Sequence, residues 1–261
     1  MIQWVAWLGA FFLDRVGELG RSGLFFYRMI RGLFRPPGKF HFVVKQVYFI
    51  GTKSFFVIGF TGAFTGMVLG LQGYYTLSKF GSEGLLGSAV ALSLIRELGP
   101  VLSALMVTGR AGSAMCAEIG IMRIEEQIDA LECMAIDPHA YLVAPKLIAC
   151  LIALPLLTAF FDVVGILGGY AIGVDLLGLS SGIYMDGVER SVAWEDVYMG
   201  IVKSLWFALL IIWICTYKGF YAGLDEGSFG PEQVSKATTN AVVASSVSVL
   251  VCDYVVTSIL L

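Results

Sequence analysis

Hydrophobic residues are gathered into five long runs that are separated by shorter polar connections. Each run is long enough for an α-helix to cross a hydrocarbon core, which takes about 20 residues. The predicted spans are 54–77, 85–110, 147–174, 197–217 and 240–261. The pattern therefore predicts an all-α membrane protein with five transmembrane helices.

Residues 1–35 have helical periodicity but do not form a span. Apolar positions make one stripe and basic positions a second: Trp4, Trp7, Leu8, Phe11 and Phe12, then Arg21, Arg28, Arg31 and Arg35. Such a helix is predicted to lie in the membrane surface. A signal peptide is a weaker explanation, because the segment has no basic start and no A-x-A-like cleavage site. We divide the chain into an N-terminal interfacial segment, 1–40, and a transmembrane domain, 41–261.

The connection between the second and third spans is predicted to contain a short amphipathic helix, 121–134. Its apolar stripe is Ile121, Ile124, Ile128 and Leu131, and its acidic stripe is Glu125, Asp129 and Glu132. Asp137-Pro138 predicts the N-cap and first position of the next helix. The pattern alone fits both a helix that fills the membrane interface and a helix that docks on a soluble partner.

Composition agrees with a membrane protein, because 57% of the 261 residues are hydrophobic and the mean hydropathy is +0.82. The distribution of basic residues then predicts the orientation. Thirteen lysines and arginines precede the first span or lie in the second-to-third and fourth-to-fifth connections, against Lys79 and Arg190 on the opposite side. The positive-inside rule places the N-terminus and 121–134 in the cytoplasm and the C-terminus outside.

Arg96 and Glu97 lie inside the second predicted span. A charged residue at the centre of a span costs about 2.5–3.5 kcal/mol to insert, and such residues usually mark a pathway or a binding site. The two side chains point about 100° apart around a helix, so they need not neutralise each other. Pro100 has no N–H, so the carbonyl of Arg96 loses its helical partner. A buried charge, a freed carbonyl and a predicted kink therefore indicate a functional site.

Other ionisable residues also lie within spans: Asp162 in the third, Lys203 in the fourth and Asp253 in the fifth. Each aspartate fits either an ion pair between helices or, with Glu97, a proton relay in a secondary transporter. The absence of an evident inverted repeat argues against such a transporter. Glycines on one face of the first span favour close helix packing, although a groove beside Leu69 is an alternative.

Several kinds of chemistry are not indicated. The sequence has neither a G-x-x-x-x-G-K-[ST] nucleotide-binding loop nor an H-E-x-x-H zinc motif. Gly178-Leu-Ser-Ser-Gly182 matches G-x-S-x-G, but it lies in an outer loop without a histidine for a hydrolase triad at Ser180. The five cysteines are scattered and predict neither disulfides nor a metal site. We expect a non-catalytic chain without its own cofactor or metal, and no nucleic-acid partner.

The segments GMVLGLQGY (66–74), ALSLIRELGPV (91–101), GRAGSAMCAEIG (109–120), 126–138 and KATTNAVV (236–243) closely resemble the MlaE (YrbE) family. Members of this family are permease subunits of bacterial lipid-transport ABC systems. The resemblance implies a homodimer in the bacterial inner membrane with a periplasmic C-terminus. Implied partners are a cytoplasmic ATPase (MlaF), which binds ATP and magnesium, a STAS-type protein (MlaB) and a periplasmic MCE-domain hexamer (MlaD) that binds lipid.

The resemblance also implies site residues. A phospholipid cavity between two copies would be lined by Leu69, Leu77, Arg96, Glu97, Leu98 and Lys203. The segment 121–134 would be the coupling helix that docks on the ATPase through Ile121, Ile124, Glu125, Ile128, Asp129, Leu131 and Glu132. The expected function is transfer of phospholipid between the inner membrane and a periplasmic carrier, which maintains outer-membrane lipid asymmetry. The alternatives are the secondary transporter and an Mce-type importer of sterols or fatty acids.

Overall fold

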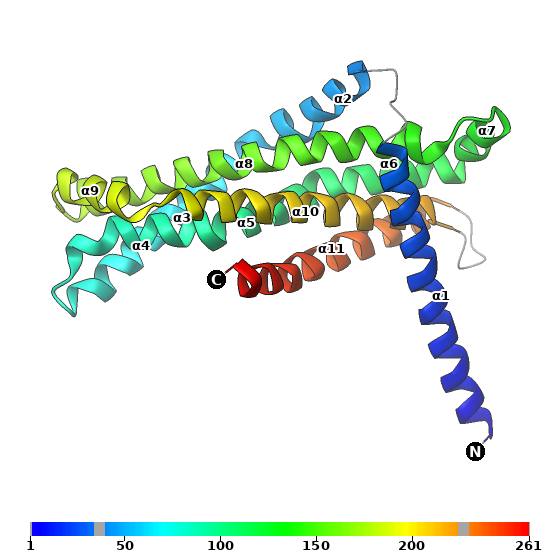
Figure 1. Ribbon diagram of the computed structural model, residues 1–261, viewed down its shortest axis with the longest axis horizontal. Helices are drawn as coiled ribbons and strands as arrows, with labels where there is room; N and C mark the ends of the chain where they lie inside the picture. The colour runs from blue at the N-terminus through cyan, green and yellow to red at the C-terminus, as the bar shows by residue number, and fades with distance from the viewer. Residues whose placement is uncertain (1, 34–39, 224–229, 261) are drawn as a thin grey trace.

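The computed structural model describes residues 2–33, 40–223 and 230–260, with side chains described from residue 16 onward. Every regular element in these ranges is helical (Figure 1). The α-helices are α1 (Ile2–Leu33), α2 (Phe40–Val47), α3 (Lys53–Ser78), α4 (Leu86–Ser93), α5 (Gly99–Val107), α6 (Ser113–Ile124), α7 (Gln127–Cys133), α8 (Ala144–Tyr170), α9 (Ser181–Ser191), α10 (Trp194–Phe220) and α11 (Pro231–Leu260). Short π-helical turns join α2 to α3, α4 to α5 and α5 to α6.

Five continuous helical segments are long and apolar enough to cross a membrane, as predicted. They are Phe40–Ser78, Glu83–Ile124, His139–Leu176, Trp194–Phe220 and Pro231–Leu260. Each begins before its predicted apolar run, because the residues that precede the run are also helical. The second segment is 42 residues long, more than the roughly 20 that cross the hydrocarbon. The chain is therefore a multi-pass membrane protein.

Helix α1 runs across one end of the bundle, not along it (Figure 1). Its second half is amphipathic, with Phe25 and Met29 buried and Arg28 exposed. Trp213 of α10 donates a hydrogen bond to the carbonyl of Ser22, at 3.1 Å. The side chains of the predicted stripe from Trp4 to Phe12, and Arg35, lie outside the described residues, so the structure does not test them.

Helices α3 and α8 pack closely through their glycines. Gly62, Gly66 and Gly70 are buried on α3, and a Cβ atom at Gly66 would lie 1.8 Å from the carbonyl oxygen of Gly165 on α8. Only glycine permits this backbone approach, since any side chain would overlap the opposite helix. The glycine stripe therefore serves helix packing.

The prediction of one continuous helix over 121–134 is wrong. Helix α6 ends at Ile124 and α7 begins at Gln127, with Glu126 between them in the left-handed conformation at φ 58°. The bend changes which residues share a face: Ile121 is 48% exposed, whereas Ile128 is fully buried in the core. The predicted N-cap at Asp137 is confirmed, because its carboxylate accepts the N–H of His139 at 3.0 Å.

Candidate functional site: a charged cluster between spans

Lys203 of α10 lies at the centre of a cluster of charged groups. Its side chain is fully buried. Its ammonium group lies 2.6 Å from a Glu97 carboxylate oxygen and 3.0 Å from one of Asp253 on α11. Three helical segments thus contribute to one ionic contact, and the two carboxylates offset the cost of burying the lysine.

The same ammonium group compensates for the missing backbone hydrogen bond at Pro100. Lys203 Nζ donates to the carbonyl oxygen of Arg96 at 2.9 Å, the carbonyl that the proline leaves without a helical partner. The turn around it, Leu94–Leu98, is π-helical. The sequence predicted this freed carbonyl, and the structure supplies its partner from a helix more than 100 residues away in the chain.

Arg96 does not pair with its neighbour Glu97 but with Asp196, in the first turn of α10. The guanidinium Nε and Nη2 both lie 2.6 Å from Asp196 Oδ1. The other carboxylate oxygen, Oδ2, accepts the N–H of Ala193 at 2.9 Å and so caps the helix. Asp196 therefore holds the arginine and the start of α10 together.

The cluster is partly open to its surroundings. The side chains of Arg96 and Glu97 are 40% and 42% exposed, whereas those of Asp196 and Asp253 are 4% and 20% exposed. With two basic and three acidic groups, the fully ionised cluster has one net negative charge. A guanidinium that is held by one carboxylate and is accessible from one side can exchange that carboxylate for another anion.

The structure brings Lys203 into contact with the Arg96 carbonyl and the Glu97 carboxylate. The three leucines of the predicted site, Leu69 and Leu77 on α3 and Leu98 beside Glu97, are half-buried against the core. The predicted site did not include Asp196, which directly precedes the fourth predicted span. Asp253 was predicted only as an ion-pair or relay residue. The sequence signal for Asp196 was its place in the run Trp194-Glu-Asp at the start of a span, because acidic residues are common in the first turn of a helix.

Asp162 of α8 lies beside Gly99, and no described hydrogen bond or ion pair joins it to the cluster. Its Oδ1 atom is buried without a hydrogen-bond partner among the described residues, and a Cβ atom at Gly99 would lie 1.8 Å from it. Glu97 and Asp253 meet at Lys203, but no described hydrogen bond connects them to Asp162. The three carboxylates of the relay hypothesis therefore do not form one hydrogen-bonded chain in the described part of the protein.

The residues predicted to dock on a partner lie at the end of the bundle near α1. Glu125, Asp129 and Glu132 are exposed, and Asp129 forms an ion pair with Arg123 at 2.6 Å. Ile121, Ile124 and Glu125 line an apolar cavity of about 580 Å³ together with Val234 of α11. Leu131 is half-buried and Ile128 fully buried. Among the apolar residues predicted to dock, Ile121 and Ile124 therefore line the cavity between α6 and α11, whereas Ile128 lies in the core.

Comparison with known proteins gives consistent matches. Residues 43–259 match the family model described as Permease MlaE. The chain is 40% identical to the intermembrane phospholipid transport system permease protein MlaE of Haemophilus influenzae, over 100% of this chain and 98% of that protein. It is 42% identical to a probable ABC transporter permease protein of Rickettsia bellii, over 93% and 92%. It is also 34% identical to the chloroplastic protein TRIGALACTOSYLDIACYLGLYCEROL 1 of Arabidopsis thaliana, over 85% of this chain and 62% of that protein.

Proposed function

The chain belongs to the MlaE permease family, and from this premise we propose how it acts. It is the membrane permease of an ABC system for intermembrane phospholipid transport, and it moves phospholipid between the inner membrane and a periplasmic carrier. ATP hydrolysis takes place on a separate subunit, because the chain has no nucleotide-binding loop. The observation that supports the lipid path best is the accessible Arg96, whose anionic partner can be exchanged.

In the proposed mechanism a lipid phosphate replaces Asp196 at Arg96. The guanidinium offers several N–H donors in one plane, which suits the oxygens of a phosphate. Leu69, Leu77 and Leu98 would contact the acyl chains. Glu97 and Asp253 hold Lys203 in place and keep the net charge of the site negative. Because a negative site disfavours a bound phosphate, the return of Asp196 to Arg96 favours release of the phosphate. Binding and release thus differ by the exchange of one anion for another.

The remaining partners follow from the family. We propose that two copies form a homodimer with the lipid cavity between them, and that a STAS-type protein and a periplasmic MCE-domain hexamer complete the assembly. The distribution of basic residues supports a position of α1 in the membrane surface, with its end of the bundle on the cytoplasmic side. An ATPase that carries ATP and magnesium would then dock at the cavity formed by Ile121, Ile124 and Glu125.

Photocrosslinking tests the lipid path directly. With p-benzoylphenylalanine in place of Leu98, we expect ultraviolet light to attach a diacyl phospholipid to the permease in native membrane. The Arg96→Gln substitution should lower this adduct about tenfold or more, because a charged hydrogen bond contributes about 1.5–3 kcal/mol. Mass spectrometry of the adduct identifies the lipid. A sterol or fatty acid adduct would favour the Mce-type alternative, and an unchanged adduct in Arg96→Gln would exclude Arg96 from the path.

A matched pair of isoleucines tests the docking surface. Ile121 and Ile183 are 48% and 49% exposed, and they belong to α6 and α9, whose positions are at opposite ends of the bundle (Figure 1). We expect Ile121→Asp to reduce co-purification of the ATPase about tenfold or more, as a hot-spot residue would, while Ile183→Asp leaves it unchanged. Both variants should remain folded, whereas Ile128→Asp should not accumulate, because its side chain is fully buried. Equal ATPase yields from the two exposed variants would reject the proposed docking surface.

A further inference from the structure

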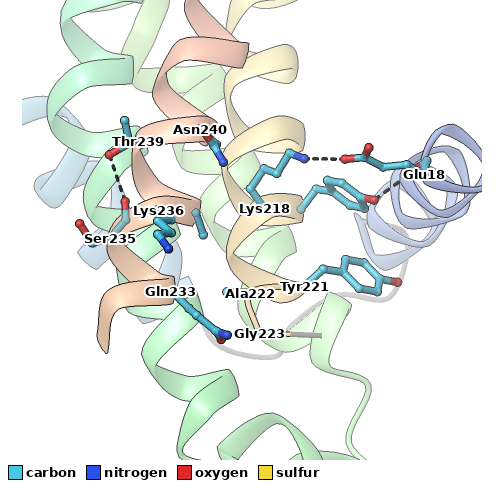
Figure 2. Close-up of a pocket in the computed structure, with 12 residues that line it drawn as sticks. Glu18, Lys218, Tyr221, Ala222, Gly223, Gln233, Ser235, Lys236, Thr239 and Asn240 are labelled. Atoms are coloured by element: carbon cyan, nitrogen blue, oxygen red, sulfur yellow. Dashed lines mark hydrogen bonds and ion pairs between the residues drawn. The ribbon is translucent and has the colours of Figure 1, made fainter. Parts of the chain in front are cut away.

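A polar cavity lies at the end of the bundle near α1, away from the Lys203 cluster. It has a volume of about 630 Å³ and is bounded by α1, the last turns of α10 and the first turns of α11. Figure 2 shows Lys218 and Tyr221 on the α10 side and Lys236, Thr239 and Asn240 on the α11 side. Lys218 is about four turns from Lys203 along α10, a separation of about 22 Å. The cavity is therefore distinct from the charged cluster.

One basic group of the cavity is fixed and the other is available. Lys218 Nζ lies 2.6 Å from Glu18 Oε1 on α1, with both side chains about one-third exposed. Lys236 is 63% exposed, and its only described ion pair is with Glu232 at 3.1 Å, itself 82% exposed. Such a surface pair contributes little, at most about 1 kcal/mol. A stronger anion can thus replace Glu232 at Lys236 with little loss.

The available lysine has a second hydrogen-bond donor on its own helix. Asn240 is exposed and lies one helical turn after Lys236, so the two side chains share a face of α11. Tyr221 lines the cavity from the α10 side, with its hydroxyl directed toward α1 (Figure 2). Ammonium and amide donors on one helix face suit a group with several acceptor oxygens, such as a phosphate.

The position of the cavity favours a ligand at the membrane surface. It lies where α10 ends and α11 begins, and the apolar part of α11 starts directly after Asn240. Exposed arginines of α1, including Arg28 and Arg31, lie at the same end of the bundle. Basic pockets between helices at the surface of a membrane are suited to anionic lipid headgroups.

We propose that this cavity binds a phosphate group through Lys236 and Asn240, with Lys218 held beside them by Glu18. A phospholipid headgroup of the adjoining leaflet or a water-soluble phosphate compound can supply that group. The site does not depend on the Lys203 cluster being the lipid path. It would give the permease a second phosphate site, at the surface of the leaflet next to α1.

The experiment uses p-benzoylphenylalanine at the exposed cavity residue Thr239 in the purified, detergent-solubilised assembly. Phosphatidylglycerol is the probe, and diacylglycerol, which lacks the phosphate, is the matched lipid. We expect an adduct with phosphatidylglycerol that falls about tenfold or more in Lys236→Gln/Asn240→Ala. Lys79→Gln, at the opposite end of the bundle, should leave it unchanged. The adduct at Leu98 should be unaffected in all these variants, so failure here is separable from failure of the lipid path.

Excess inorganic phosphate distinguishes the two sources. Suppression of the adduct by phosphate would show that the cavity recognises the phosphate itself, and an adduct that persists would show that it requires the whole lipid headgroup. Phosphate binding, measured by calorimetry and abolished by the double variant, without a lipid adduct would identify a soluble ligand. An equal adduct with diacylglycerol, or neither adduct nor phosphate binding, would overturn the proposal.

Discussion

Replacing Lys203 with methionine should prevent stable assembly of the permease. The change leaves Glu97 and Asp253 facing each other without a cation and removes the donor to the carbonyl of Arg96. Removing one partner of a buried ion pair costs about 3–5 kcal/mol, a large part of the stability of a typical domain. Size-exclusion chromatography and thermal unfolding in detergent measure this loss.

Two controls separate the structural and functional roles of Lys203. Lys218→Met is the same substitution on the same helix, but its ion pair with Glu18 is partly exposed, so the expected cost is at most about 1 kcal/mol. Adding Glu97→Gln and Asp253→Asn to Lys203→Met removes the unbalanced charges and should restore assembly. Transport should stay absent in this triple variant if the cluster serves the lipid path. Wild-type stability of Lys203→Met alone would contradict the assigned contacts.

Opposite changes in lipid retention are expected from the two partners of the Arg96–Asp196 pair. Arg96→Gln removes the donor for a lipid phosphate and should reduce co-purified phospholipid about tenfold to a hundredfold. Asp196→Asn removes the competing anion, while its amide oxygen can still accept the N–H of Ala193 at the start of α10. This variant should retain more phospholipid and release it more slowly to an acceptor carrier.

A double variant distinguishes separate partners for Arg96 and Glu97 from a mutual ion pair between them. The double swap Arg96→Glu/Glu97→Arg should not restore transport, because the two residues have different partners, Asp196 and Lys203. Quantifying bound phospholipid and the rate of its transfer in each variant tests the model. Equal retention by Asp196→Asn and the wild type would show that Asp196 does not compete with the lipid. Recovery by the double swap would show that Arg96 and Glu97 act only as a mutual ion pair.

The sequence alone determined the features that depend on local chain properties. Span number follows from the length of each apolar run, because a helix must cover the hydrocarbon thickness whatever it packs against. The N-cap at Asp137 and the freed carbonyl of Arg96 are equally local, since each depends on neighbours within four residues. The family resemblance, which rests on short motifs, was likewise readable from the sequence and agrees with the comparisons.

Only the tertiary structure decided which groups meet. The partners of Arg96 and Glu97 lie on α10, about 100 residues further along the chain, and helical periodicity contains no information on which helices are neighbours. The same holds for the glycines of α3, whose role depends on the backbone of α8 that they face. At 121–134 the apolar spacing fitted one helix, but Glu126 adopts a left-handed conformation that turns Ile128 into the core. A one-dimensional pattern reports which positions are apolar, whereas the fold determines whether they contact core, lipid or a partner.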